Sequence, residues 1–75
     1  MAAIFIAGVI MVYTNSKMEW LISEYVHSER DRRILYRRYL DGLTHEAIAN
    51  EFQMSKRQIQ YIDYWFRQEV ISQHL

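Results

Sequence analysis

The 75-residue sequence predicts an all-α fold, a small helical domain of about four helices. Apolar residues recur three and four positions apart from Met18 onward, which is the spacing of one helix face. Residues that cap or end helices, such as Thr44 and Ser55, separate these apolar stretches. Half of the chain (51%) is hydrophobic, which excludes a disordered protein. The length allows one small domain with a thin core.

The chain begins with an uncharged apolar stretch, residues 1–13. It is shorter than the roughly 20 residues of a membrane-spanning helix, and no basic residues precede it as in a signal peptide. Its β-branched residues make a strand conceivable, but a lone strand would have to pair with another chain or pack on the helices. We therefore divide the chain into an N-terminal segment (1–17) and a helical domain (18–75). The N-terminal segment either serves oligomerisation or packing, or is an extension with little role.

The apolar spacing places the first two helices. The first covers Met18–Val26, with Ser16 as its expected N-cap. The second covers Arg30–Asp41, and Gly42 then supplies a left-handed turn that ends it.

Two further helices follow. Thr44 begins the third and can cap its first turn. Residues 53–55 interrupt the pattern, and Ser55 caps a fourth helix that runs from Lys56 to about Ser72.

The apolar residues between Leu43 and Ile62 follow the pattern of a helix-turn-helix. The third helix needs two apolar residues one turn apart with a small contact residue, the turn needs one buried side chain, and the fourth helix needs two apolar residues three apart. The six positions are filled by Ile48, Phe52, Ala49, Met54, Ile59 and Ile62. The sequence therefore predicts a helix-turn-helix at the C-terminal end of the domain.

This stretch, Leu43-Thr-His-Glu-Ala-Ile-Ala to Phe52-Gln-Met-Ser-Lys and Ile59, resembles region 4 of sigma-70-type factors. The preceding Arg33-Ile-Leu-Tyr-Arg-Arg-Tyr-Leu-Asp-Gly is similar to the helix before the motif in that family. The resemblance covers about Glu29 to Phe66 and includes no other sigma region, so a complete sigma factor is not expected. Small phage and mobile-element regulators are similar in size. Gln53 stands where the family usually has Gly, at a cost of order 1 kcal/mol for a left-handed conformation.

The resemblance implies that the start of the fourth helix enters the DNA major groove. Arg and Lys can read guanine, and Gln can read adenine. The alternative is that these residues form an ordinary solvated helix face. The predicted DNA-contact residues on this helix and at the start of the third are Thr44, Ser55, Lys56, Arg57, Gln58, Gln60 and Tyr61.

An arginine cluster lies on the second helix. Arg30, Arg33 and Arg37 share one face, and Arg38 lies beside it. Helices outside the groove often contact phosphates, so Arg33 and Arg37 join the predicted DNA-contact set. The alternative is a solvated charged face with local pairs such as Arg37 with Asp41.

The aromatic run Tyr61-Ile-Asp-Tyr-Trp-Phe cannot face one core with all its side chains. We expect the first helix and the apolar N-terminus to bury Tyr64 and Trp65. The alternative is an exposed aromatic patch that binds another protein.

The charges and the catalytic inventory narrow the function. The net charge is zero, but residues 30–57 alone carry a net charge of +3, in the helix-turn-helix and the helix before it. His27, His45 and His74 lie far apart, cysteine is absent, and no phosphate-binding loop is present, so we expect no enzyme, no metal, no cofactor and no small-molecule substrate.

The sequence therefore predicts a cytoplasmic transcription regulator that binds specific double-stranded DNA through the helix from Lys56. One module of this size would bind weakly, so a homodimer or a protein partner is expected. The alternative function is a protein-interaction module on the same scaffold, which binds RNA polymerase or inhibits a nucleic-acid enzyme as small phage inhibitors do.

Overall fold

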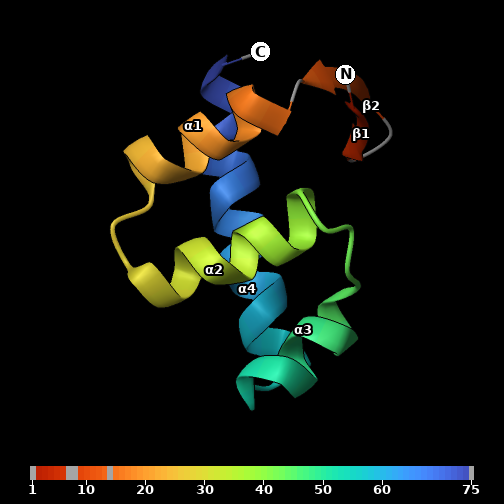
Figure 1. The fold of residues 1–75 in the computed structure, drawn as a ribbon, viewed down its shortest axis with the longest axis vertical. Coiled ribbons are helices and arrows are strands. Elements are labelled where there is room, and N and C mark those ends of the chain that lie inside the picture. The colour runs from red at the N-terminus through yellow and green to blue at the C-terminus, as the bar shows by residue number, and fades with distance from the viewer. Residues whose placement is uncertain (1, 7–8, 14, 75) are drawn as a thin grey trace.

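The computed structural model describes residues 2–6, 9–13 and 15–74. Within these residues four α-helices lie between an N-terminal β-hairpin and a short 3-10 helix (Figure 1). In chain order the elements are β1 (Ala2–Ile6), β2 (Val9–Tyr13), α1 (Asn15–Tyr25), α2 (Glu29–Tyr39), α3 (His45–Phe52), α4 (Lys56–Glu69) and η1 (Ile71–His74). The predicted all-α domain with a C-terminal helix-turn-helix is confirmed, and the hairpin is an addition to it.

Helix α4 is the central element. It runs along the long axis of the molecule, and α1 and α2 cross it (Figure 1). Helix α3 packs against its N-terminal end, while η1 packs back against its C-terminal end. The hairpin lies beside α1, at the end of the molecule opposite α3 (Figure 1). The helix-turn-helix and the hairpin are therefore far apart.

The core is built from the apolar faces of all four helices. Each apolar side chain removed from water stabilises the fold by about 1.5–3 kcal/mol. The predicted core residues Ile48, Ala49, Ile59 and Ile62 are buried, while Phe52 and Met54 are half-buried against the core. The buried hydrophobic residues are Met18, Leu21, Ile22, Val26, Ile34, Leu35, Ile48, Ala49, Ile59, Ile62, Phe66, Val70 and Ile71.

Side-chain caps define where three of the helices begin. The hydroxyl oxygens of Ser28, Thr44 and Ser55 each accept a hydrogen bond from the backbone N–H three residues on, which satisfies a free amide of the first turn. The caps predicted at Thr44 and Ser55 are confirmed. The cap predicted at Ser16 is wrong, because α1 already begins at Asn15.

The ends of the helices depend on backbone conformation. Gly42 has φ of 74°, which confirms the predicted left-handed turn after α2. Gln53 ends α3 with φ of 54° and ψ of 43°, so it adopts the left-handed conformation although it has a Cβ. Helix α4 ends at Glu69 rather than near Ser72, and the chain continues as the tighter η1.

The N-terminal segment forms a strand pair within one chain. β1 and β2 are antiparallel, with Ala2 opposite Tyr13 and Ile4 opposite Met11. The expectation that a strand here would need another chain or the helices as its partner is therefore wrong, because the segment turns back on itself. Residues 7–8 between the strands lie outside the described residues. None of the described helices is long and apolar enough to span a membrane.

Three of the four aromatic residues in the run on α4 are exposed. The exposed fractions are 71% for Tyr61, 56% for Tyr64 and 38% for Trp65. The expectation that the first helix and the N-terminal segment would bury Tyr64 and Trp65 is wrong. Ile59, Ile62 and Phe66 form the side of α4 that faces the core. The three exposed aromatic residues lie on the other sides of the helix.

Replacing Gln53 with Gly should stabilise the protein by up to about 1 kcal/mol, because Gly adopts the left-handed conformation without a Cβ clash. Urea unfolding measures this change. The control is Gln60→Gly, an exposed position inside α4, which should destabilise by about 1 kcal/mol, since Gly weakens a helix interior. Destabilisation of similar size by both substitutions would show that the Gln53 conformation carries no strain.

Candidate nucleic-acid interface

The start of α4 is fixed by a reciprocal capping box. The Ser55 hydroxyl oxygen accepts a hydrogen bond from the Gln58 backbone N–H at 3.1 Å. The Ser55 backbone N–H donates to Gln58 Oε1 at 3.0 Å. Both side chains therefore hold the first turn of α4 in place. The fixed turn sets the direction in which Lys56 and Arg57 project.

Lys56, Arg57, Gln60 and Tyr61 project from this capped turn into solvent. Ile59 is buried between them and fixes which side of the helix faces outward. The exposed face thus combines two cations, one amide and one phenol. These groups can bond to phosphates and to base edges in a major groove.

One side of this face borders a groove of about 410 Å³, which we call the Lys56 groove. It lies between the N-terminal ends of α3 and α4. The lining residues are Arg38, Thr44, His45, Glu46, Lys56 and Gln60. The Thr44 hydroxyl accepts from Ala47 N–H at 3.1 Å, so it positions the positive end of α3 at this groove. Two basic side chains and a helix N-terminus meet here, with Glu46 as the opposing charge.

The other side of the face borders a second groove of about 430 Å³, which we call the Arg57 groove. Arg30 of α2 and Arg57 of α4 both line it. Helix α2 crosses α4, so its two ends lie on opposite sides of the exposed face. Arg30 in its first turn lines the Arg57 groove, and Arg38 in its last turn lines the Lys56 groove. Most of the predicted contact set is thereby brought together in one region.

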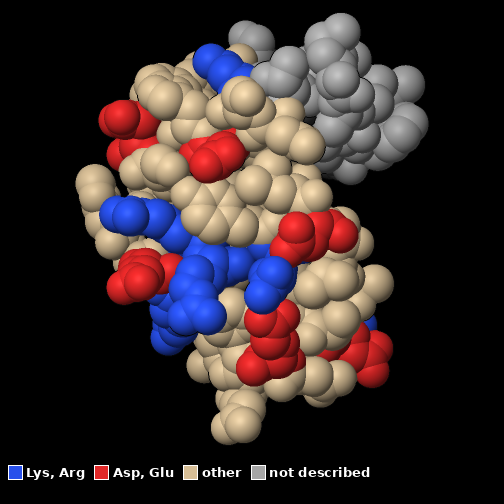
Figure 2. Space-filling view, in the orientation of Figure 1, with Lys and Arg blue, Asp and Glu red and all other residues tan. Residues whose placement is uncertain are grey.

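Arg33 and Arg37 lie elsewhere, against the C-terminal part of α3. Arg37 bonds to Asp41 at 2.8 Å and to Glu51 at 3.1 Å. The bond to Asp41 and then the bond to Glu51 raise the pKa of Arg37. The Arg33 guanidinium carbon lies 5.8 Å from the ring centroid of Phe52. The basic side chains over α2 have acidic neighbours (Figure 2). Phosphate contact by these two arginines stays a prediction, and Arg37 would have to leave two carboxylates to make it.

A buried carboxylate joins the three helices behind this face. Asp63 on α4 is 3% exposed. Its carboxylate accepts a hydrogen bond from the Tyr39 hydroxyl of α2 and lies 2.6 Å from His45 Nε2 of α3. Arg38 Nε and Arg67 Nε lie 3.7 and 3.8 Å from its oxygens. A buried charge is tolerated only when such partners compensate its lost hydration.

Tyr39 is affected by the same site. Its burial, followed by the nearby Asp63 charge and the hydrogen bond to it, raises the pKa of the Tyr39 hydroxyl far above its usual range. The phenol therefore keeps its proton and remains a donor to Asp63. The sequence does not reveal this site, because His45 and Tyr39 are 18 and 24 residues away from Asp63 along the chain. The one available signal was the position of Asp63 next to Ile62 on the apolar side of α4.

The described residues contain no cluster of three or more His, Cys, Asp or Glu side chains that could hold a metal ion. His45, the first residue of α3, is engaged with Asp63.

Comparison with known proteins identifies the motif. Residues 28–62 match the family model described as Sigma-70, region 4. The match begins at the Ser28 cap of α2 and ends in the middle of α4, so it contains the whole turn and the exposed face. The predicted resemblance is confirmed over these residues, which form a helix-turn-helix. No curated protein and no solved structure matches the chain.

Asp63→Asn should lower the free energy of unfolding by about 3 kcal/mol, because it leaves Tyr39, His45 and two arginines without the charge that they surround. Asp41→Asn is the matched control, since it removes an exposed carboxylate that also bonds to an arginine, and should cost about 0.5 kcal/mol. Denaturant unfolding measures both.

Tyr39→Phe removes a single bond from the site and should cost about 1.5 kcal/mol, which keeps the comparison measurable if Asp63→Asn does not fold. Equal costs for the Asp63 and Asp41 variants would contradict a central role for the buried carboxylate.

Proposed function

We propose that this chain, which carries a sigma-70 region 4 helix-turn-helix at residues 28–62, is a regulator of transcription that binds specific double-stranded DNA. Helix α4 enters the major groove with its first two turns. Lys56, Arg57, Gln60 and Tyr61 meet bases or phosphates there, and Ser55 and Gln58 contribute through the capped turn. Such a regulator acts in the cytoplasm on the cell's own DNA or on that of a mobile element.

The observation that carries the proposal is the exposed face at the start of α4, flanked by two grooves that each hold an arginine of α2. Phosphates of the two strands that border a major groove would lie over these grooves. Thr44 and Lys56 serve one strand, and Arg57 with Arg30 serves the other. Residues in the two grooves would thus contact phosphates and position the protein, while the exposed face between them would read the bases.

The charge distribution supports specific rather than general binding. A net charge of zero gives little attraction to DNA as a whole. The net charge of +3 over residues 30–57 coincides with the motif and the helix before it. Affinity then depends on the local geometry of one face.

Replacing Lys56 and Arg57 together with Ala should weaken duplex binding strongly and reduce the slope of log K against log salt by about 2. The readout is a titration of a fluorescent duplex at several salt concentrations. Lys17→Ala on α1 is the control for the loss of a lysine, since Lys17 is exposed and lies far from this face.

Absence of duplex affinity for the wild-type chain at low salt would reject the DNA-binding proposal. Affinity that survives the double substitution would show that another face binds.

The second candidate function is a protein-interaction module that binds RNA polymerase or inhibits a nucleic-acid enzyme. The exposed aromatics Tyr61, Tyr64 and Trp65 favour it, because aromatic side chains are enriched in protein interfaces. A wild-type chain without duplex affinity would leave this candidate as the better one.

The hairpin is our candidate for a dimer contact. A two-stranded hairpin is only marginally stable alone, and its outer edges can accept further strands. Residues 2–6 and 9–13 contain no charged residue that would block such pairing. We propose that β1 pairs antiparallel with β1 of a second copy. The distant position of the hairpin would leave both helix-turn-helices free for two half-sites (Figure 1).

In that pairing Ile4 lies opposite its own copy, at a Cα separation of about 4.5–5.5 Å that suits a disulfide. The chain has no cysteine, so Ile4→Cys introduces a single thiol. It should form a cross-linked dimer rapidly under mild oxidation, while the control Val12→Cys on β2 should not. Equal cross-linking of both variants, or a monomer at every concentration in sedimentation equilibrium, would contradict the pairing.

A further inference from the structure

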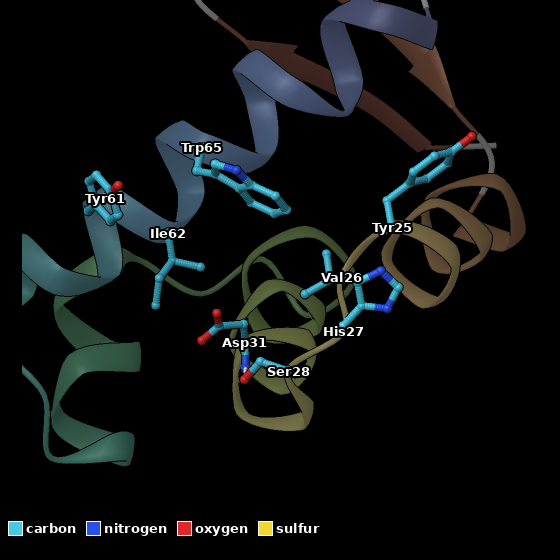
Figure 3. Close-up of a pocket in the computed structure, with 8 residues that line it drawn as sticks. All are labelled: Tyr25, Val26, His27, Ser28, Asp31, Tyr61, Ile62 and Trp65. Carbon is cyan, nitrogen blue, oxygen red and sulfur yellow. Dashed lines mark hydrogen bonds between the residues drawn. The ribbon is translucent and has the colours of Figure 1, made fainter.

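A third groove lies between α4 and the loop that joins α1 to α2. Its volume is about 360 Å³, within the range of about 300–1,000 Å³ typical of small-ligand sites. Trp65 and Ile62 on α4 lie across the groove from Val26 and His27 of the loop (Figure 3). We call it the Trp65 groove. Its lining residues are Tyr25, Val26, His27, Ser28, Asp31, Tyr61, Ile62 and Trp65.

The groove is lined by aromatic rings that the fold leaves partly in water. Tyr61 and Trp65 are both exposed, and the exposed ring of Tyr25 packs edge-on against Trp20 and His74. His27 adds a fourth exposed ring. Flat rings around an open groove are suited to stacking against another flat ring.

The Trp65 groove continues into the Arg57 groove. Both are lined by Asp31, Tyr61 and Ile62, so one surface runs from Arg57 past Tyr61 to Trp65. The proposed duplex-reading face and the aromatic groove are therefore continuous along α4.

The charge along this surface suits a phosphate backbone. The side chain of Arg30 is 60% exposed, and Arg57 projects into solvent. Asp31 is the acidic lining residue of both grooves, and its carboxylate lies 3.0 Å from Arg30 Nη2, which compensates its charge. Cations at one end and aromatic rings at the other are the combination that binds single strands, in which the backbone follows the cations and successive bases stack on rings.

We propose that the Trp65 groove binds unpaired bases of a DNA single strand that continues from the duplex held by α4. This inference rests on the proposed function. Stacking on Trp65 and Tyr61 tolerates any base, so the groove recognises strand separation next to the site rather than a sequence. An apolar side chain of a protein partner could use the rings but not the adjoining Arg30 and Arg57, which is why the observations favour a nucleic acid.

The test compares a blunt duplex with the same duplex carrying a short thymidine extension on either strand. The wild-type chain should bind one of the extended duplexes about tenfold more tightly or better, as expected when at least one base stacks. Trp65→Ala should abolish that gain and change blunt-duplex affinity by no more than about twofold. Trp20→Ala is the matched control, because it removes the other exposed tryptophan, which does not line the groove, and it should keep the gain.

Two results would overturn the inference: no gain from either extension in the wild-type chain, or a gain that Trp65→Ala retains. If the blunt duplex does not bind at all, the proposed function fails, and a thymidine oligonucleotide alone then decides the inference. In a Trp20→Phe variant, quenching of the remaining Trp65 fluorescence by that oligonucleotide supports the groove, and unchanged fluorescence rejects it.

Discussion

The buried carboxylate of Asp63 on α4 is the point at which α2 and α3 both bond to α4. The carboxylate of Asp63 is buried, Tyr39 of α2 and His45 of α3 both reach it, and Arg38 and Arg67 lie beside it. Apolar packing alone tolerates sliding of one helix over another, but hydrogen bonds to one carboxylate do not. The site therefore acts as a geometric restraint in a core too small to supply much rigidity by area.

That restraint lies directly beneath the surface to which we assign function. His45 lines the Lys56 groove and also contacts Asp63, so the N-terminus of α3 is held at a fixed distance from α4. The Ser55 capping box then fixes the direction of the first turn. The side chains that would touch DNA therefore project from a helix that these contacts hold in place, and sites on such elements are more precise than sites on loops.

Periodicity was sufficient to predict the helices, their caps at Thr44 and Ser55, and the left-handed turn residues, because these depend on near neighbours in the chain. It could not predict the Asp63 site, since a carboxylate on an apolar face has no local explanation and its partners come from other helices. It also identified Tyr61, Tyr64 and Trp65 as competing for one core without revealing which would be exposed, because coverage depends on how α1 crosses the bundle. The hairpin could not be predicted, because residues 1–13 read as one continuous apolar stretch without a clear turn signal between two strands.

Mapping backbone NMR shifts of this 75-residue chain during titration with a DNA duplex tests the central claim most directly. We expect the largest changes on Thr44 and on residues 55–61, smaller ones at Arg30 and Arg38, and little change on α1. Changes concentrated on α1 and η1, or none at a duplex excess, would contradict it.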